Sequence, residues 1–389
     1  MSSMGNATRR SNTPSVRQRL LSRYRANLLA ARRTTYAIGS ANRPLPYFGT
    51  VGVSNLGDEL VLTIAEKSFP GRVLIPVDGR RPLQRRLLRI AASDAQSMLV
   101  GGGTSILSLP LLRTLQQAVH LGLRFSTFGS GVDDPSFFGQ LEPAARDAWE
   151  SVFASSEEIG VRGPMSVAAL HELGVTRARM VGDPAIVFAK ETAPAAGGGQ
   201  VLGINVGTAY GAVWGGDEES ALKAVTQLAT SVRRSGWSVR LFSVWPPDTA
   251  IAARIAREAS LGEGSICAEY FDGRRLATAL GQCDLFVGMK LHSQILATCS
   301  GVPTLAIEYQ PKTSDFMSAI GSASEVVGIN SVRAATLREF VEHMSMCREE
   351  IAIRQWSGCR ALANRFLSYV SELGGSPDHL SRWLRSDHP

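Results

Sequence analysis

Short apolar runs alternate with amphipathic helical stretches along the chain from about residue 47 onward. Apolar runs that are separated by helices are typical of parallel strands buried on both faces of a sheet. In the first array of such runs, strands are expected within 46–54, 71–77, 97–101, 124–135, 149–163 and 178–188. The first strand is expected to be followed, within 46–69, by a Gly-rich loop and a helix that starts near Asp58. Further helices are expected at 109–122 and from Pro164 onward.

A second array with the same alternation begins at residue 201. Its strands are expected within 201–207, 237–245, 265–271, 284–289 and 303–309, and its helices at 218–235, 248–260, 274–283 and from Leu291. Residues 191–200, rich in Ala, Pro and Gly and without periodicity, are interpreted as a linker. We therefore predict an α/β fold of two Rossmann-like doubly wound domains, 45–190 and 201–335, that face each other across a cleft, with C-terminal helices at 336–389.

The positive charge of the chain belongs to its first segment. Of the 41 Lys and Arg residues, nine Arg lie in residues 1–44, which contain no Asp or Glu. The remaining chain has 32 basic and 34 acidic residues, a balance of −2. A nucleic-acid-binding domain would need a basic face on its folded part, so this class is not favoured. The five cysteines form no CxxC pair and are interpreted as thiols of a reducing compartment.

The basic arm, residues 1–44, allows three interpretations. Val16, Leu20, Tyr24 and Leu28 recur at helical spacing among arginines, which suits a basic amphipathic helix on an anionic membrane surface. The same pattern fits a solvated arm or a helix docked on the first domain, and an Arg-rich start without acids also resembles an organelle transit peptide. No run approaches the ~20 apolar residues of a membrane span. The expectation is a cytoplasmic protein, with peripheral contact at the inner membrane face through residues 1–40 as a hypothesis.

Two glycine-containing turns in the first array follow buried strands. Asn55, Gly57 and Asp58 lie where a strand passes into a helix. Gly57 permits a positive φ or a close backbone approach, and Asp58 is either a helix cap or a carboxylate that accepts a proton from a ligand hydroxyl. Gly102 and Gly103 follow the expected strand at 97–101, where their N–H groups can face an anion or a sugar, although helix–sheet packing also favours glycine there.

A charged pair of positions follows later in the same array. Arg162 stands just ahead of the helix that opens at Pro164, and Asp183 ends the expected strand that closes the array. Arg162 either pairs with the acids of the nearby "SSEE" stretch or grips a carboxylate or phosphate with two donors. Both residues are expected on the carboxyl side of the sheet.

Cations gather at the ends of two strands in the second array. Lys290 and His292 lie where a strand passes into a helix, and Lys312 follows the next strand. A lone histidine is often structural, but neighbouring cations and a helix N-terminus together indicate an anionic ligand. No HxxxH motif or His/Asp cluster predicts a metal site.

These motifs, in this order, resemble those of the polysaccharide pyruvyl transferase family. The shared segments are "NLGDE" (55–59), "GGG" (101–103), "VRGPMSVAALHELGV" (161–175), "GDPA" (182–185), "LGINVG" (202–207) and "KLHSQILATCSGVPTLAIEYQPK" (290–312). The resemblance covers about residues 48–320 and implies a fold like that of the two-domain glycosyltransferases of the B type. It implies transfer of pyruvyl from phosphoenolpyruvate, as a ketal, to two sugar hydroxyls. The family usually has Arg where this chain has Lys290, and lysine loses the two-pronged grip on the donor.

The resemblance also implies roles for the candidate residues. Arg162, Lys290, Leu291 and Lys312 would bind phosphoenolpyruvate, with no other cofactor and no metal, and His292 would act as acid or as donor to the leaving phosphate. Asp58 would accept a proton from the attacking hydroxyl, and Asn55, Gly57, Gly102, Gly103 and Asp183 would shape the loops. Phe137 or Phe138 could stack on the acceptor sugar or belong to the core.

Two other functions remain open at this point. A nucleotide-sugar glycosyltransferase of the same fold would need a carboxylate to hold a ribose, for which Glu308 is a candidate. A non-catalytic glycan-binding protein would keep the fold without turnover. The acceptor sugar, and whether it is linked to lipid, nucleotide or polymer, does not follow from the sequence.

Overall fold

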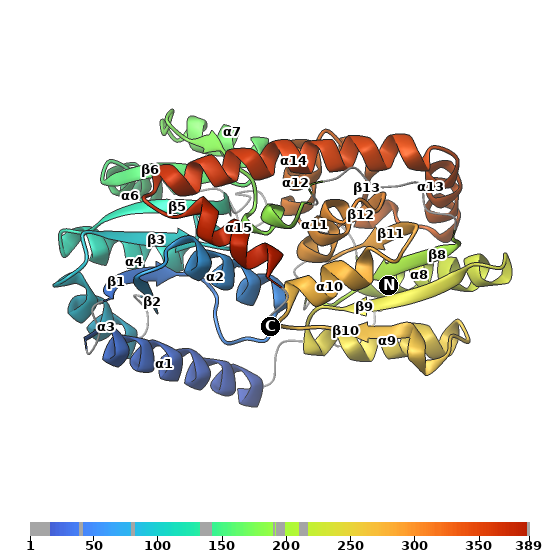
Figure 1. The fold of residues 1–389 in the computed structure, drawn as a ribbon, viewed down its shortest axis with the longest axis horizontal. Coiled ribbons are helices and arrows are strands. Elements are labelled where there is room, and N and C mark those ends of the chain that lie inside the picture. The colour runs from blue at the N-terminus through green and yellow to red at the C-terminus, as the bar shows by residue number, and fades with distance from the viewer. Residues whose placement is uncertain are drawn as a thin grey trace, which may run out of the picture.

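The computed structural model describes residues 16–38, 42–78, 82–132, 142–189, 191, 199–209 and 217–386. It has two parallel sheets side by side, each with helices on both faces, and a helical C-terminus (Figure 1). The predicted fold class is therefore confirmed. The expected linker lies mostly outside the described residues, as do Phe137 and Phe138 and the first 15 residues of the basic arm.

The first sheet has seven parallel strands, with the order β2-β1-β3-β5-β6-β7 and β4 paired to β5. Their bounds are β1 Arg43–Phe48, β2 Arg72–Pro76, β3 Ser97–Gly101, β4 Thr104–Ile106, β5 Arg124–Val132, β6 Ser156–Val161 and β7 Arg179–Met180. The strand order reverses between β1 and β3. Ligands of such sheets bind outside the carboxyl ends of the strands at this point of reversal.

The helices of this domain are α1 Val16–Ile38, α2 Leu56–Ser68, α3 Pro82–Ala92, α4 Leu109–His120, α6 Pro143–Phe153 and α7 Pro164–Glu172. Helix α2 begins where the sequence predicts, because the Asn55 side chain accepts a hydrogen bond from Gly57 N (3.1 Å). The prediction for 178–188 is wrong in part, because the strand ends at Met180. Pro184–Phe188 forms the 3₁₀-helix η1 instead, since Asp183 caps it by accepting a hydrogen bond from Ala185 N (3.0 Å).

The second sheet has six parallel strands with the order β10-β9-β8-β11-β12-β13. Their bounds are β8 Val201–Asn205, β9 Ser238–Ser243, β10 Ile266–Ala268, β11 Leu285–Gly288, β12 Thr304–Glu308 and β13 Val326–Gly328. In chain order this is the 3-2-1-4-5-6 arrangement of Rossmann folds, which reverses between β8 and β11. The helices of this domain are α8 Glu218–Arg234, α9 Pro246–Glu258, α10 Gly273–Leu280, α11 Leu291–Cys299 and α12 Lys312–Ala319.

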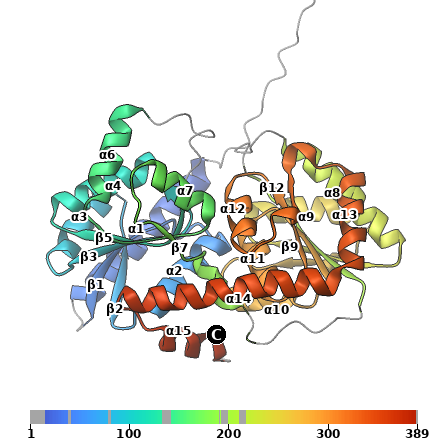
Figure 2. The same ribbon diagram turned by 90° about the horizontal axis from the view of Figure 1, so that it is seen from above.

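The C-terminal helices connect the two domains. After α13 (Ala334–Met346), the long helix α14 (Arg348–Glu372) runs along both sheets (Figure 2). At one end the Gln355 side chain hydrogen-bonds to the backbone N and O of Thr304 in the second domain (2.8 and 3.0 Å). At the other end the Tyr369 hydroxyl donates to Thr127 O in the first domain (2.7 Å). Helix α15 (Pro377–Arg385) then packs on α2. The C-terminal segment thus holds the relative position of the domains.

The basic arm is a helix docked on the first domain over its described length. Helix α1 lies against β2 and α3, and its Ala30, Thr34 and Ala37 side chains are buried. Arg33 donates to Leu74 O (3.0 Å) and forms an ion pair with Glu66. This is the docked-helix interpretation. Among the described residues, no helix is long and apolar enough to cross a membrane.

Candidate functional site

A cavity of about 300 Å³ lies between the carboxyl ends of the two sheets. Eight of the eleven residues predicted for the site line it: Asn55, Asp58, Gly103, Arg162, Lys290, Leu291, His292 and Lys312. The other three, Gly57, Gly102 and Asp183, lie directly behind this lining. The loops after β1 and β3 supply one wall, and those after β11 and β12 supply the other. The two points of strand reversal therefore face the same space.

His292 crosses from the second domain to the first. It is the second residue of α11, and its imidazole lies on the backbone of Gly57 in the first turn of α2. A Cβ atom at position 57 would stand only 1.9 Å from His292 Nδ1. Gly57 is helical, so its role is the close approach and not a positive φ. The opposite ring nitrogen, Nε2, lies 3.5 Å from Asp183 Oδ1, and the side chain is 14% exposed.

Asp183 and Arg162 form a buried ion pair behind the histidine. Arg162 Nε donates to Asp183 Oδ2 at 3.1 Å, and the two side chains are 1% and 0% exposed. The guanidinium also donates to Gly103 O (3.0 Å) and Thr104 Oγ1 (3.3 Å). Arg162 therefore does not pair with the nearby "SSEE" acids. Most of its donors hold the glycine loop and Asp183, so its main effect on the cavity is to position other groups.

The two aspartates of the site have pKa values shifted in opposite directions. Burial alone would raise the pKa of Asp183, but His292 and Arg162 outweigh it and lower that pKa to about 2. Burial raises the pKa of Asp58 to about 6, although His292 and Lys312 oppose the rise. Asp183 is thus a permanent anion at neutral pH. Asp58 titrates within the range where an acid–base group is useful.

The glycine loop after β3 has two residues that require glycine for conformational reasons. Gly102 and Gly103 have φ values of +66° and +70°. The Gly103 carbonyl accepts hydrogen bonds from Arg162 and from Gly131 N (2.9 Å). The loop thus offers its carbonyl side to the arginine, and whether its N–H groups meet an anion stays a prediction.

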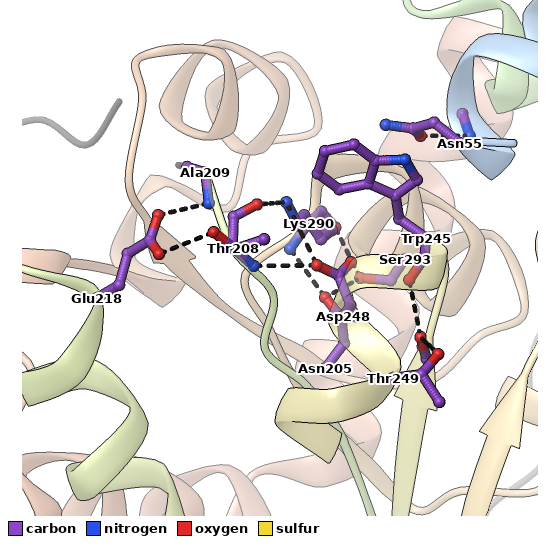
Figure 3. Close-up of polar contacts among 12 residues, drawn as sticks. Asn55, Asn205, Thr208, Ala209, Glu218, Trp245, Asp248, Thr249, Lys290 and Ser293 are labelled. Carbon is purple, nitrogen blue, oxygen red and sulfur yellow. Dashed lines mark hydrogen bonds and ion pairs between the residues drawn. The ribbon is translucent and has the colours of Figure 1, made fainter. Parts of the chain in front are cut away.

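Lys290 is held in place by a polar network within the second domain (Figure 3). Its backbone N donates to Asn205 Oδ1 (2.9 Å), and its ammonium donates to Thr208 O. Asp248 Oδ1 lies 3.8 Å from Lys290 Nζ and accepts a hydrogen bond from Thr208 N (2.9 Å). Burial raises the pKa of the fully buried Asp248 to about 6, against the opposing charge of Lys290.

Aromatic side chains complete the cation-rich wall. Lys290 Nζ lies 5.3 Å from the Trp245 ring centre and 5.6 Å from that of Tyr309, and Lys312 Nζ lies 4.7 Å from that of Tyr309. Such cation–π contacts hold ammonium groups without neutralising them. Trp245 also donates from Nε1 to Val53 O in the first domain (3.3 Å). The aromatic residues therefore orient the lysines and connect the domains at the cavity.

The two walls of the cavity are joined by a helix cap that crosses between the domains. Helix α7 begins next to Arg162, and its N-cap, Gly163, has no side chain. Asp315, in the first turn of α12, instead accepts hydrogen bonds from Met165 N (2.8 Å), Ser166 N (3.3 Å) and Ser166 Oγ (2.7 Å). Because α12 begins at Lys312, this cap fixes the distance between the first wall and the second.

Sequence reasoning did not find Trp245, Asp248, Tyr309 or Asp315. The only local signal was position, since Trp245 and Tyr309 each follow a strand of the second sheet. Asp248 and Asp315 look like ordinary residues of a helical first turn, and their partners are far away in the chain. Glu308, the candidate for a ribose carboxylate, ends β12 but does not line the cavity. Among the described residues, no group of three or more His, Cys, Asp or Glu side chains could share a metal ion.

Comparison with known proteins gives a family match and a set of similar folds. The family model described as Polysaccharide pyruvyl transferase matches residues 55–311. No curated protein matches the chain.

Several solved structures share the fold at low sequence identity. A protein described as a UDP-N-acetylglucosamine 2-epimerase from Listeria monocytogenes has a TM-score of 0.57 and 12% identity, over 86% of this chain and 97% of that one. The UDP-GlcNAc 2-epimerase from Neisseria meningitidis, bound to UDP-GlcNAc, has a TM-score of 0.53 and 11% identity, over 85% and 99%. A glycosyltransferase from Rickettsia africae has a TM-score of 0.50 and 10% identity, over 88% and 97%. At such identities, these structures show the two-domain fold alone.

Proposed function

The chain belongs to the polysaccharide pyruvyl transferase family, and from this premise we propose that it transfers the enolpyruvyl unit of phosphoenolpyruvate to two hydroxyls of a sugar. The product is a pyruvate ketal on an exopolysaccharide, cell-wall or glycolipid glycan, and phosphate is released. One observation supports this proposal most strongly. Lys290, His292 and Lys312 from one domain share a cavity with Asp58 from the other.

The charge of the cavity fits the donor. Phosphoenolpyruvate has a carboxylate and a phosphate, and the two lysines reach the cavity from the ends of the neighbouring strands β11 and β12. The N-terminus of α11 adds positive potential at the same place. Arg162 supports the donor site from behind through the glycine loop and Asp183. Because phosphoenolpyruvate is a metabolite of the cytoplasm, we place the reaction there.

The proposed chemistry uses His292 and Asp58 in sequence. Protonated His292 gives its proton to the methylene carbon of the enol, which leaves a cationic carbon beside the carboxylate. A sugar hydroxyl attacks this carbon and loses its proton to Asp58. The second hydroxyl then attacks and closes the ring, and its proton passes to the now neutral His292. Phosphate leaves and takes the proton that Asp58 had accepted. Asp183, 3.5 Å from His292 Nε2, gives the imidazolium a fixed negative partner and orients the ring.

The direct test of this function uses purified protein with phosphoenolpyruvate and a panel of sugars. We expect phosphate release only when an acceptor is present, together with an acceptor mass increased by one pyruvate less water. A nucleotide-sugar glycosyltransferase would instead be stabilised in thermal shift by uridine or guanosine diphosphates. A non-catalytic glycan-binding protein would release no phosphate with any acceptor.

We expect Asp58→Asn to lower activity and to raise stability at neutral pH. The folded protein favours the protonated carboxyl, because the pKa of Asp58 is about 6 instead of 3.8. Stability therefore falls as pH rises from about 4 to 6, and a neutral amide removes a cost of roughly 3 kcal/mol at pH 7. The activity loss is expected to be about 10–100-fold, at the low end for acid–base groups because the cationic carbon is a strong electrophile.

Two measurements check the Asp58 prediction. The wild-type kcat/KM should fall below about pH 6 as one proton binds, and the variant should lose this limb. Thermal unfolding at pH 7 and pH 4 should show the gain in stability at the higher pH alone. Asp147→Asn serves as the matched control, because Asp147 is exposed on α6 and does not line the cavity. A variant with full activity and an unchanged pH profile would remove Asp58 from the mechanism.

A further inference from the structure

Two neighbouring helices on the outer side of the first domain expose an unusual share of large apolar side chains. Helices α1 and α3 lie against each other and are joined by a hydrogen bond from Gln84 Nε2 to Asn27 Oδ1 (3.0 Å). Among the residues that the structure describes, ten large apolar side chains are exposed, and five of them lie on these two helices. They are Tyr24 (66% exposed), Leu28 (38%), Tyr36 (60%), Leu83 (41%) and Ile90 (46%).

The same two helices have positive charge without any negative charge. Among the side chains that the structure describes on these helices, the exposed arginines are Arg25, Arg32, Arg85, Arg86 and Arg89, and neither helix contains Asp or Glu. Acidic side chains of other elements lie nearby. Glu66 of α2 is already paired with Arg33, Glu59 of α2 lies near the same arginine and accepts from Ser54 N, and Asp94 follows the C-terminus of α3. Because the chain beyond residue 44 has a small negative balance, this surface differs in sign from the rest of the molecule.

The surface formed by α1 and α3 reaches the loop that shapes the cavity. Arg25 Nη1 donates to Ser54 Oγ at 3.4 Å, and Ser54 directly precedes Asn55, which lines the cavity. Ser54 has a left-handed φ of 56°, and its N–H donates to Glu59 Oε1 (3.1 Å), so the loop holds a defined shape. Figure 1 shows α1 along the lower edge of the first domain. The surface therefore adjoins the first-domain wall of the cavity.

We propose that α1 and α3 form a docking surface for an anionic phospholipid bilayer, and that the protein takes its acceptor at that bilayer. The uptake of the acceptor at the bilayer rests on the proposed function, whereas the docking to the bilayer does not. Arginines attract anionic headgroups, and tyrosines favour the boundary between headgroups and acyl chains. Exposed Leu and Ile side chains gain free energy when they enter the acyl region.

The apolar component favours a bilayer over a nucleic acid. Arginines alone would suit a phosphate backbone equally well. The exposed aliphatic side chains Leu28, Leu83 and Ile90, however, find no apolar partner along that backbone, whereas a bilayer provides one. A lipid-linked sugar acceptor at the bilayer would then stand close to the loop of residues 52–55.

Binding of the full chain to vesicles tests the docking surface without donor or acceptor. We expect sedimentation with vesicles of phosphatidylcholine that contain phosphatidylglycerol, and little with phosphatidylcholine alone. The triple variant Arg85→Gln, Arg86→Gln, Arg89→Gln should weaken binding to the anionic vesicles by at least ~10-fold, as should Leu28→Gln with Leu83→Gln and Ile90→Gln. Both variants should keep wild-type turnover of a water-soluble acceptor, because none of these residues lines the cavity.

A matched control removes the same charge elsewhere. Arg233, Arg234 and Arg257 are exposed on α8 and α9 of the second domain, and their triple change to Gln should leave vesicle binding unchanged. Three results would overturn the proposal. They are an equal loss of vesicle binding in this control, no binding of the wild type to anionic vesicles, and binding to single-stranded polynucleotide in preference to vesicles. Vesicle binding with no phosphoenolpyruvate turnover would keep the surface and refute the proposed function.

Discussion

Replacing His292 with alanine is expected to lower kcat for pyruvyl transfer by at least ~100-fold while the fold survives. The imidazole is the group best placed to give a proton to the enol, because it lies in the cavity between Asp183 and the first turn of α2. Without it, the acids that remain in the described lining are the ammonium groups of Lys290 and Lys312, which bind the donor, and Asp58, which serves as the base. Thermal unfolding should change little, because the ring is at the cavity surface.

Steady-state kinetics with phosphoenolpyruvate and an acceptor would measure this loss. His120→Ala is a suitable control, because His120 is an exposed residue at the end of α4 and should tolerate the change. Near-normal turnover by His292→Ala would contradict the assignment. A rise in KM for phosphoenolpyruvate with unchanged kcat would limit the role of His292 to binding.

Gly57→Ala offers an independent test of the same geometry. Alanine is favoured over glycine inside a helix by up to ~1 kcal/mol, so helix propensity alone predicts a more stable protein. The new Cβ would, however, stand 1.9 Å from His292 Nδ1, and the ring must therefore move. We expect the activity of this variant to fall toward that of His292→Ala. Such a loss would show that the activity requires the close contact between the His292 ring and the backbone of α2. Full activity of Gly57→Ala would contradict this.

Much of the site was predictable because it lies at strand ends. In parallel sheets the carboxyl ends of neighbouring strands converge, so Asn55 and Asp58 could be placed at the edge of one sheet and Lys290 and Lys312 at the edge of the other from apolar runs and turns alone. The ordered motifs of the family then added the pairing of the two domains. The fold class was predictable for the same reason, since each buried strand left a continuous apolar run.

The supporting contacts were not predictable from local pattern. Asp315 caps α7 from another domain, some 150 residues away in the chain, and nothing in its own helix indicates that partner. The sequence left Arg162 either to the nearby "SSEE" acids or to an anionic ligand, whereas the fold directs it to Asp183 and the glycine loop. The docked position of α1 depends on Ala30, Thr34 and Ala37, which are small residues that leave only a weak apolar stripe.

The two aspartates beside His292 illustrate how one environment can serve stability and chemistry. His292 lowers the pKa of Asp183 most, its buried ion pair with Arg162 lowers it further, and together they hold that pKa near 2. Asp58 lies at the same histidine without such an ion pair at its carboxylate, and burial dominates its pKa. Removal of the charge should therefore have opposite effects on stability at the two positions. The stabilising aspartate orients the acid, and the destabilised one is available as a base.

Replacing Asp183 with alanine is expected to lower the free energy of unfolding at pH 7 by about 3–5 kcal/mol, because Arg162 would remain buried without its partner. The change also removes the cap of η1 and the negative partner of His292, so activity should fall as well. The folded pKa of Asp183 is lowered to about 2, so its stabilising charge is fully present above the ordinary pKa of 3.8 and is lost as pH falls toward 2. The difference between variant and wild type should therefore shrink below about pH 4.

Urea unfolding at several pH values would measure this difference. Asp217→Ala is the matched control, because Asp217 caps α8 at the surface. Its replacement should lower the free energy of unfolding by only about 1 kcal/mol. Asp183→Asn keeps the shape of the side chain and isolates the effect of the charge. If neither variant at position 183 loses more free energy of unfolding than Asp217→Ala, the ion pair with Arg162 contributes little to stability. The orientation of His292 would then have to come from Gly57 and the helix around it.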